Sequence, residues 1–163
     1  MPVLVDAANV LHVTGVLPPH LAGVDLVGLA ELVERSRYAD RQVTLVCDGG
    51  PAGSSRTRRE SPVAIVRTGA RSADDVMVER IEASTVPRRL TVVTEDREVL
   101  TAARRRRCPT MRSTDFLAHL AVDADSPRGP GPGARKPQGS LDPSAVNEWM
   151  RTFGLDPREG GAP

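Results

Sequence analysis

The chain has 163 residues, enough for one domain with a substantial core and an additional tail. Its net charge of +1 indicates no particular partner, and the small aromatic fraction of 2% argues against a surface that stacks several bases of a single strand. No apolar run is long enough for a membrane-spanning helix, the first residues lack a signal-peptide pattern, and the two cysteines lack metal-site spacing. We therefore expect a cytoplasmic protein outside the membrane, with Cys47 and Cys108 as free thiols.

The first predicted strand is the apolar, β-branched run at residues 3–5, which ends at Asp6. Two similar runs follow, at residues 43–47 and 90–94, and each also precedes an acidic residue. These residues are Asp48 after the second run, and Glu95 and Asp96 after the third. If the three strands are parallel neighbours, their carboxylates meet at the sheet edge where open α/β proteins bind ligands.

Helical patterns separate these strands. Residues 24–33 form an apolar stripe behind the potential cap Asp25, and residues 73–82 follow the potential cap Ser72. A third helix is expected to begin near Asp96 and to end in the arginines 104–107. The remaining patterns predict a flexible glycine-rich loop at 48–55, short strands at 63–66 and 110–112, and a last helix at 116–120 capped by 113–115. The alternation predicts a doubly wound, mostly parallel α/β sandwich over residues 1–122.

The C-terminal part differs in composition. Residues 123–140 are rich in proline and glycine and predict a linker, while 155–163 predict a disordered tail. Between them, residues 141–154 predict a short amphipathic helix that presents Trp149 and Phe153 on one face. This helix is too short to fold alone in water, so we expect it to dock on the first domain, on a second copy or on another partner.

Acidic residues are the strongest chemical signal. Crowded carboxylates repel one another unless a proton or a cation neutralises them, and oxygen ligands without histidine or cysteine favour Mg²⁺ or Mn²⁺. Such a site is suited to hydrolysis of a phosphodiester, with Asn9 and Thr94 placed to hold a water or a phosphate oxygen. The alternative is that each aspartate only caps a helix or serves a turn. For Asp115 this alternative is the favoured interpretation. The candidates are Asp6, Asp48, Asp74, Asp75, Asp96 and Asp115.

Five segments together resemble one protein family. Residues 5–10, Val-Asp-Ala-Ala-Asn-Val, resemble the opening D-G-x-N-V/L motif of NYN domains, which belong to the PIN-like nuclease superfamily. The segments at 46–49, 73–76 and 93–98 follow in the family's order, and 113–117 resembles its closing element. The resemblance covers residues 3 to 120 and is closest to the bacterial YacP-like ribonucleases. Ala7 departs from it, because the family usually has glycine there.

This resemblance implies a PIN-like (Rossmann-like) three-layer sandwich and a ribonuclease that depends on Mg²⁺ or Mn²⁺. By position, Asp6, Asp74 and Asp96 match the family's acidic metal-binding core, and Asn9 matches the amide of its opening motif. Asp75 would add a metal ligand and Asp48 a further acid, since both match positions that are acidic in part of the family. The implied activity is endonucleolytic cleavage of RNA, with mRNA or ribosome-associated RNA as partner.

Arginines on the loops near the predicted acidic edge are candidates for contacts with RNA phosphates, although a solvated loop explains them equally well. They are Arg56, Arg58, Arg59, Arg67 and Arg71. Two other functions stay open: a non-catalytic RNA- or ribosome-binding module, and a phosphatase or 5′-nuclease that acts on DNA. The sequence has no D-x-D-G start typical of one phosphatase class, and no G-x-G-x-x-G, G-x-x-x-x-G-K-[ST] or G-x-S-x-G motif.

Overall fold

The structure is a computed structural model, and it describes residues 1–56 and 60–126. The chain divides into two units, 1–128 and 129–163, and the described residues all belong to the first. The predicted C-terminal helix with Trp149 and Phe153, and most of the predicted linker, lie outside the described residues, as do Arg58 and Arg59. Within the described ranges, none of the helices combines the length and apolarity needed to cross a membrane.

The described chain alternates between strands and helices, as the sequence predicts. Six strands, five α-helices and two short 3-10 helices occur in residues 1–56 and 60–126. In chain order they are β1 (Val3–Asp6), α1 (Ala7–His12), η1 (Pro19–Leu21), α2 (Leu26–Arg35), β2 (Val43–Cys47), β3 (Gly49–Arg56), β4 (Val63–Gly69), α3 (Ala73–Ala83), η2 (Pro87–Arg89), β5 (Thr91–Val93), α4 (Arg97–Arg105), β6 (Thr110–Met111) and α5 (Ser113–Asp125).

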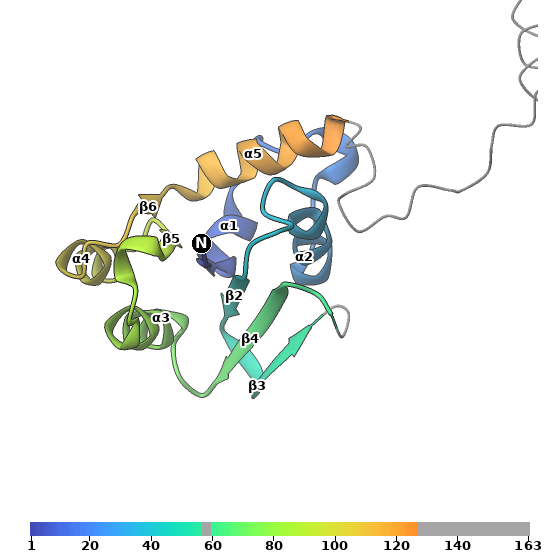
Figure 1. Ribbon diagram of the computed structural model, residues 1–163. Coiled ribbons are helices and arrows are strands. Elements are labelled where there is room, and N and C mark those ends of the chain that lie inside the picture. Colours follow the sequence, from blue (N-terminus) through green and yellow to red (C-terminus); the bar gives the residue numbers. More distant parts are fainter. Residues whose placement is uncertain (57–59, 127–163) are drawn as a thin grey trace, which may run out of the picture. The chain divides into compact units, whose positions relative to one another are not determined.

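The strands form one sheet in the order β3-β4-β2-β1-β5-β6. All neighbouring strands are parallel except β3 and β4, which are antiparallel. Helices α3 and α4 cover one side of this sheet, and α1, α2 and α5 cover the other (Figure 1). The predicted three-layer α/β sandwich with a mostly parallel sheet is therefore confirmed.

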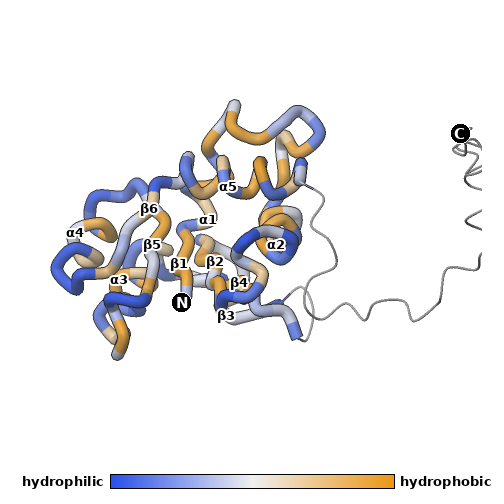
Figure 2. Tube along the Cα trace, turned by 45° about the horizontal axis from the view of Figure 1, so that its top comes forward, coloured by the Kyte–Doolittle hydropathy of each residue, from blue (hydrophilic) through white to orange (hydrophobic). Residues whose placement is uncertain are grey.

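Alternation along each strand explains the two cores. In β1, Val3 and Val5 pack with residues of α1, α2 and α5, whereas Leu4 packs with residues of α3 and α4. Because both faces of the sheet are covered, the central strands are continuously hydrophobic, and Figure 2 shows them as the apolar centre of the fold. The pattern that predicted buried strands thus arises from burial on both sides.

The structure differs from the sequence-based prediction in three elements. The flexible loop predicted at 48–55 is wrong, because residues 49–56 form strand β3, whose exposed side chains give no apolar alternation. The short helix α1 after Asp6 was not predicted. The last helix is longer than predicted: it begins at Ser113, and Asp115 lies in its first turn rather than at its cap position, which Arg112 occupies.

The chain changes direction across the sheet between β1 and β5. From β1 it runs through α1 and α2 on one face to β2, whereas α3 leads to β5 and α4 leads to β6 on the opposite face. Strands β1 and β5 are nevertheless direct parallel neighbours, paired from Val3–Thr91 to Val5–Val93. Ligand sites of open α/β sheets lie outside the carboxyl ends of strands at such a switch point. Asp6 and Thr94 lie at these two strand ends.

Candidate functional site

Asp6 is the buried centre of the carboxyl edge. Only 2% of its surface is exposed, and it caps α1 by accepting a hydrogen bond from the Asn9 backbone N–H at Oδ1 over 3.0 Å. Its Oδ2 accepts hydrogen bonds from the Asn9 side-chain amide and, over 3.2 Å, from the Thr94 hydroxyl. All these donors are neutral, so the buried carboxylate is solvated by hydrogen bonds while its negative charge remains.

Thr94 joins the ends of β1 and β5. Its buried hydroxyl donates to Asp6 and accepts the backbone N–H of Asp96 over 3.0 Å, which orders the turn after β5. Asp96 then caps α4 through Oδ1, which accepts from the backbone N–H groups of Glu98 at 2.8 Å and Val99 at 3.1 Å. Asp96 therefore caps a helix, as the alternative interpretation of the sequence proposes. Only its Oδ1 accepts these hydrogen bonds, so its Oδ2 takes no part in the cap.

Two further acids meet at the start of α3, where Asp74 lies in the first turn and Asp48 approaches from the end of β2. Ser72 caps this helix by accepting the Asp75 N–H over 3.1 Å, and Asp48 accepts the Ala73 N–H over 2.6 Å. The half-buried Asp74 accepts no hydrogen bond from any residue in the described ranges. Desolvation by burial raises the pKa of Asp74 above its ordinary value, and the negative charges of four other carboxylates raise it further. These belong to Asp96, Asp6, Asp48 and Glu98.

The electrostatic coupling groups acids from four separate segments. Asp6, Asp48, Asp74 and Asp96 form no ion pair with another residue in the described ranges, so none of their repulsion is relieved by a paired arginine. A carboxyl group whose pKa is raised by burial and by several nearby acids, as for Asp74, is typical of functional sites. We call Asp6, Asp48, Asp74 and Asp96 the acidic edge.

The donor chemistry of the acidic edge fits a hard divalent cation, because every acid offers oxygen and no histidine or cysteine is among them. As the side chains stand, however, no group of three or more histidine, cysteine, aspartate or glutamate residues within 1–56 and 60–126 is placed to hold a metal ion. Binding an ion would therefore require carboxylate rotations, which the unpartnered oxygens of Asp74 permit.

Other predicted site residues lie apart from this group. Asp75 follows Asp74 on α3, but its side chain is exposed and is not among the charges that raise the pKa of Asp74. Three of the predicted RNA-binding arginines are exposed but already have protein partners. Arg56 donates to the Ser61 carbonyl at 2.5 Å, Arg67 contacts the Cys47 sulfur at 3.8 Å, and Arg71 pairs with Glu79 at 2.6 Å.

Glu98 is an acid that sequence reasoning assigned no role. It lies in the first turn of α4, and its charge contributes to the raised pKa of Asp74. The sequence feature that could have identified Glu98 is its position two residues after Asp96, because this places both acids at the start of the same helix. An acid in a first helical turn normally serves only the helix dipole, so this signal was weak.

The fold and this edge define a three-layer α/β protein with carboxylates gathered at its topological switch point. No protein-family model matches the chain, and no curated protein matches it either. Among solved structures it is similar to Rae1 (YacP) from Bacillus subtilis, with a TM-score of 0.54 and 13% sequence identity. The alignment covers 96% of this chain and 86% of that one. At this identity the similarity establishes a YacP-like fold.

Proposed function

We propose that the protein is a divalent-metal-dependent ribonuclease that cleaves RNA at the acidic edge. The single observation that carries this proposal is the coupling of Asp74 to the carboxylates of Asp6, Asp48 and Asp96 at the switch point of a YacP-like fold. Hydrogen bonds to helix starts account for Asp6, Asp48 and Asp96 one by one, but they do not require four acids to gather without a basic partner. The resemblance of the opening, central and closing motifs to YacP-like ribonucleases supports the same activity.

The residues have distinct roles in this proposal. Asp6, Asp74 and Asp96 would hold Mg²⁺ or Mn²⁺, and Asp48 would contribute negative charge from the side of β2. The bound ion would supply an acidified water and would shield the charge of the phosphate. Asn9 and Thr94 keep the Asp6 carboxylate in one orientation through their hydrogen bonds. The Asn9 amide also lies beside Asp6, where it is available to a phosphate oxygen.

The test is cleavage of a labelled mixed-sequence RNA pool with Mn²⁺, with EDTA, and with two matched variants. Asp6→Asn removes the buried charge but keeps the cap and the side-chain shape, and we expect cleavage to fall about 100-fold or more. Asp25→Asn is the control, because Asp25 also caps a helix through one Oδ1 but is exposed at the start of α2. Its cleavage should match that of the wild type. Metal-independent cleavage, or equal activity of both variants, would refute the proposal.

A non-catalytic RNA-binding module is the second candidate function. The observation that favours it is that no three potential ligands in the described residues are already arranged around a metal position. This candidate predicts that RNA binding persists in EDTA and survives Asp6→Asn, and that no RNA of the pool is cut. The same experiment therefore decides between the two functions.

A further inference from the structure

A groove of about 750 Å³ begins at Thr94, the residue that donates to Asp6. It lies on the β5–β6 side of the acidic edge, away from the arginines predicted to bind RNA on β3, β4 and the turn before α3. Its volume is within the range of about 300–1,000 Å³ that is typical of ligand sites. The walls come from β6, α4 and α5 and include Leu100, Arg104, Met111, Arg112, Asp115 and His119.

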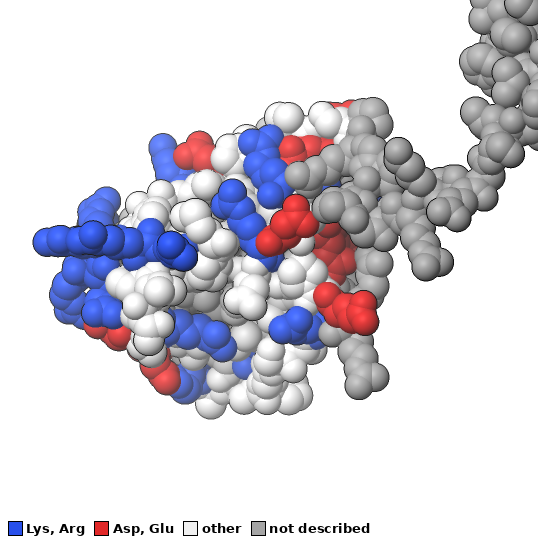
Figure 3. Space-filling view, in the orientation of Figure 1, with Lys and Arg blue, Asp and Glu red and all other residues white. Residues whose placement is uncertain are grey.

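The basic side chains of the groove are available for a ligand. Arg104, in the last turn of α4, forms no side-chain hydrogen bond or ion pair with any residue in 1–56 or 60–126. Arg112 contacts Glu95 at 3.9 Å, but both side chains are largely exposed, so this ion pair is weak. Figure 3 shows arginine side chains gathered over the α4 side of the molecule. Arg56 and Arg71 differ because each has a closer polar partner, at 2.5 Å and 2.6 Å respectively.

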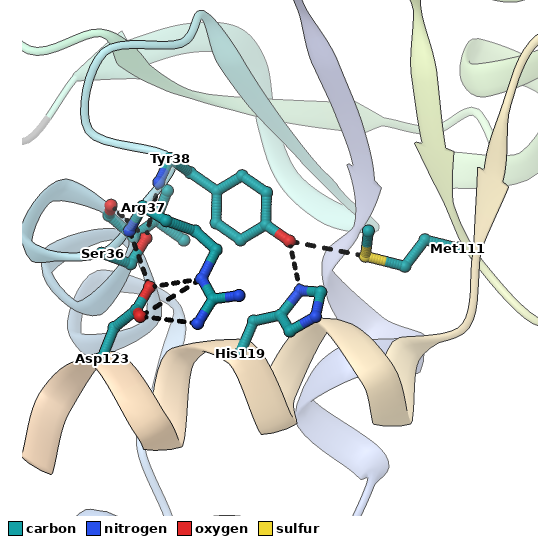
Figure 4. A network of polar contacts seen from close by, with 7 residues as sticks. Ser36, Arg37, Tyr38, Met111, His119 and Asp123 are labelled. Atoms are coloured by element: carbon teal, nitrogen blue, oxygen red, sulfur yellow. Dashed lines mark hydrogen bonds and ion pairs between the residues drawn. The ribbon is translucent and has the colours of Figure 1, made fainter.

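The inner wall is held in place by Tyr38. Its buried hydroxyl lies 2.7 Å from His119 Nδ1 on α5 and 3.5 Å from Met111 Sδ on β6, as Figure 4 shows. The Tyr38 ring packs against Phe116 with 5.0 Å between the ring centroids. Next to it, Arg37 forms a two-pronged ion pair with Asp123 that fixes α5 to the end of α2. The imidazole and the thioether are therefore preorganised as one surface of the groove.

These features match one nucleotide of single-stranded RNA. Unstacked RNA bases are recognised by stacking on flat side chains, including histidine and arginine, and by hydrogen bonds along their edges. Here His119 and Met111 provide the surface for a base, Asp115 and Glu95 provide acceptors for base N–H groups, and Arg104 and Arg112 provide partners for a phosphate. We propose that the groove binds the nucleotide next to the phosphodiester at the acidic edge.

This inference rests on the proposed ribonuclease function, and it assigns the direction in which the substrate strand leaves the site. From Thr94 the strand would run along α4, from Arg97 toward Arg104, a path of roughly 10 Å at the rise of an α-helix. The strand would thus cross the β5–β6 half of the edge, with one phosphate near Asp6 and a phosphate further along the strand near the arginines.

The test is binding of a fluorescent single-stranded RNA of mixed sequence to the full chain in EDTA, measured by anisotropy at several salt concentrations. Arg104→Gln should raise Kd about threefold to tenfold and make the salt dependence shallower by about 0.7 for one lost phosphate contact. Arg35→Gln is the matched control, because Arg35 is also an exposed arginine in the last turn of a helix, α2. Its Kd should stay within about twofold of the wild type, as expected for an arginine that contacts no phosphate.

His119→Gln tests the base-binding wall separately. Glutamine keeps a hydrogen-bonding group near Tyr38 but has no ring, so Kd should rise about fivefold or more with an unchanged salt slope. Thermal unfolding of each variant shows whether the fold is retained. If His119→Gln unfolds, Arg104→Gln still tests the groove, because position 104 is exposed.

The outcomes separate this inference from the proposed function. Weaker RNA binding by Arg104→Gln together with lower kcat/KM in Mn²⁺ supports both. Weaker binding without any cleavage by the wild type supports the groove and refutes the nuclease. Cleavage by the wild type, with Arg104→Gln and His119→Gln binding as tightly as Arg35→Gln, overturns the groove and leaves the nuclease intact.

Discussion

Removal of the Asp74 charge should relieve an electrostatic penalty in the metal-free protein and make it more stable than removal of the neighbouring Asp75 charge. The raised pKa means that ionised Asp74 is disfavoured in the folded state, first by desolvation and then by the nearby carboxylates. A group with a raised folded pKa stabilises the fold at low pH, and that stability is lost as the pH rises from about 3.8 through the folded pKa. At neutral pH, Asp74→Asn avoids this penalty.

The size of the effect follows from exposure. Two charges about 4 Å apart interact by about 1 kcal/mol in bulk water and about 4 kcal/mol near a protein surface. Asp74 is only half-buried, so solvent screening places the gain at the low end, about 0.5–1 kcal/mol. For a domain of this size that repulsion corresponds to about 2–5 °C in Tm, measured against a neighbouring variant that loses only the helix-dipole interaction.

Asp75→Asn is the matched control for the same helix start. Both residues lie in the first turn of α3, so either substitution removes a favourable dipole interaction of about 0.3–1 kcal/mol. Only Asp74 is coupled to the acidic edge. In EDTA at pH 7.5, Asp74→Asn should therefore have a higher Tm than Asp75→Asn. The difference in stability should be about equal to the repulsion energy and should shrink toward pH 4.

Mg²⁺ should reverse this order. An ion held at the acidic edge stabilises the folded wild type in proportion to its binding, and Asp74→Asn should lose most of that gain while Asp75→Asn keeps it. The reasoning on repulsion is refuted if Asp74→Asn melts at or below Asp75→Asn throughout the pH range in EDTA. If Mg²⁺ shifts none of the three melting temperatures, the metal proposal fails while the electrostatic argument stands.

Three further predictions concern stability and reactivity. Thr94→Val should lower the free energy of unfolding by about 1.5–3 kcal/mol in chemical denaturation, since it removes a donor to buried Asp6, whereas Thr91→Val at the start of β5 should be nearly neutral. Arg107→Gly should raise Tm, with a gain of about 1 kcal/mol, because Arg107 has a φ of 58° just after α4; a lower Tm would contradict this. Ellman's reagent should label Cys47 well before Cys108, since burial raises the pKa of the Cys108 thiol and shields it; equal rates in the folded protein would show that Cys108 is accessible.

Sequence patterns were sufficient to predict those strands whose side chains are buried. The apolar runs that became β1, β2 and β5 are covered on both faces, and each directs the residue after it to one edge. Strand β3 could not be found this way, because its side chains are exposed and only backbone pairing, such as Ser54 with Val66, makes it a strand. Backbone pairing of this kind cannot be predicted from the pattern of side chains.

In the candidate site, local contacts could be predicted from the sequence and long-range contacts could not. The caps Asp25, Ser72 and Asp96 are local, so their spacing from the helix start was enough to predict them. The Thr94–Asp6 hydrogen bond spans 88 positions, and the Tyr38–His119 contact spans 81. Both depend on which strands and helices become neighbours. The role of His119 therefore depends on the placement of α5 beside the end of α2, which the residues around position 119 do not reveal.

Comparison of two aspartates shows why Asp6 is more than a helix cap. Asp25 and Asp6 each accept a backbone N–H three residues ahead, at 2.8 Å and 3.0 Å, but Asp25 is exposed and Asp6 is 2% exposed. The cap needs no burial, and a buried carboxylate is costly unless several donors solvate it. Asn9 and Thr94 supply those donors without cancelling the charge. A serine or asparagine would cap α1 equally well at lower cost, so the buried charge itself is the feature that needs a function.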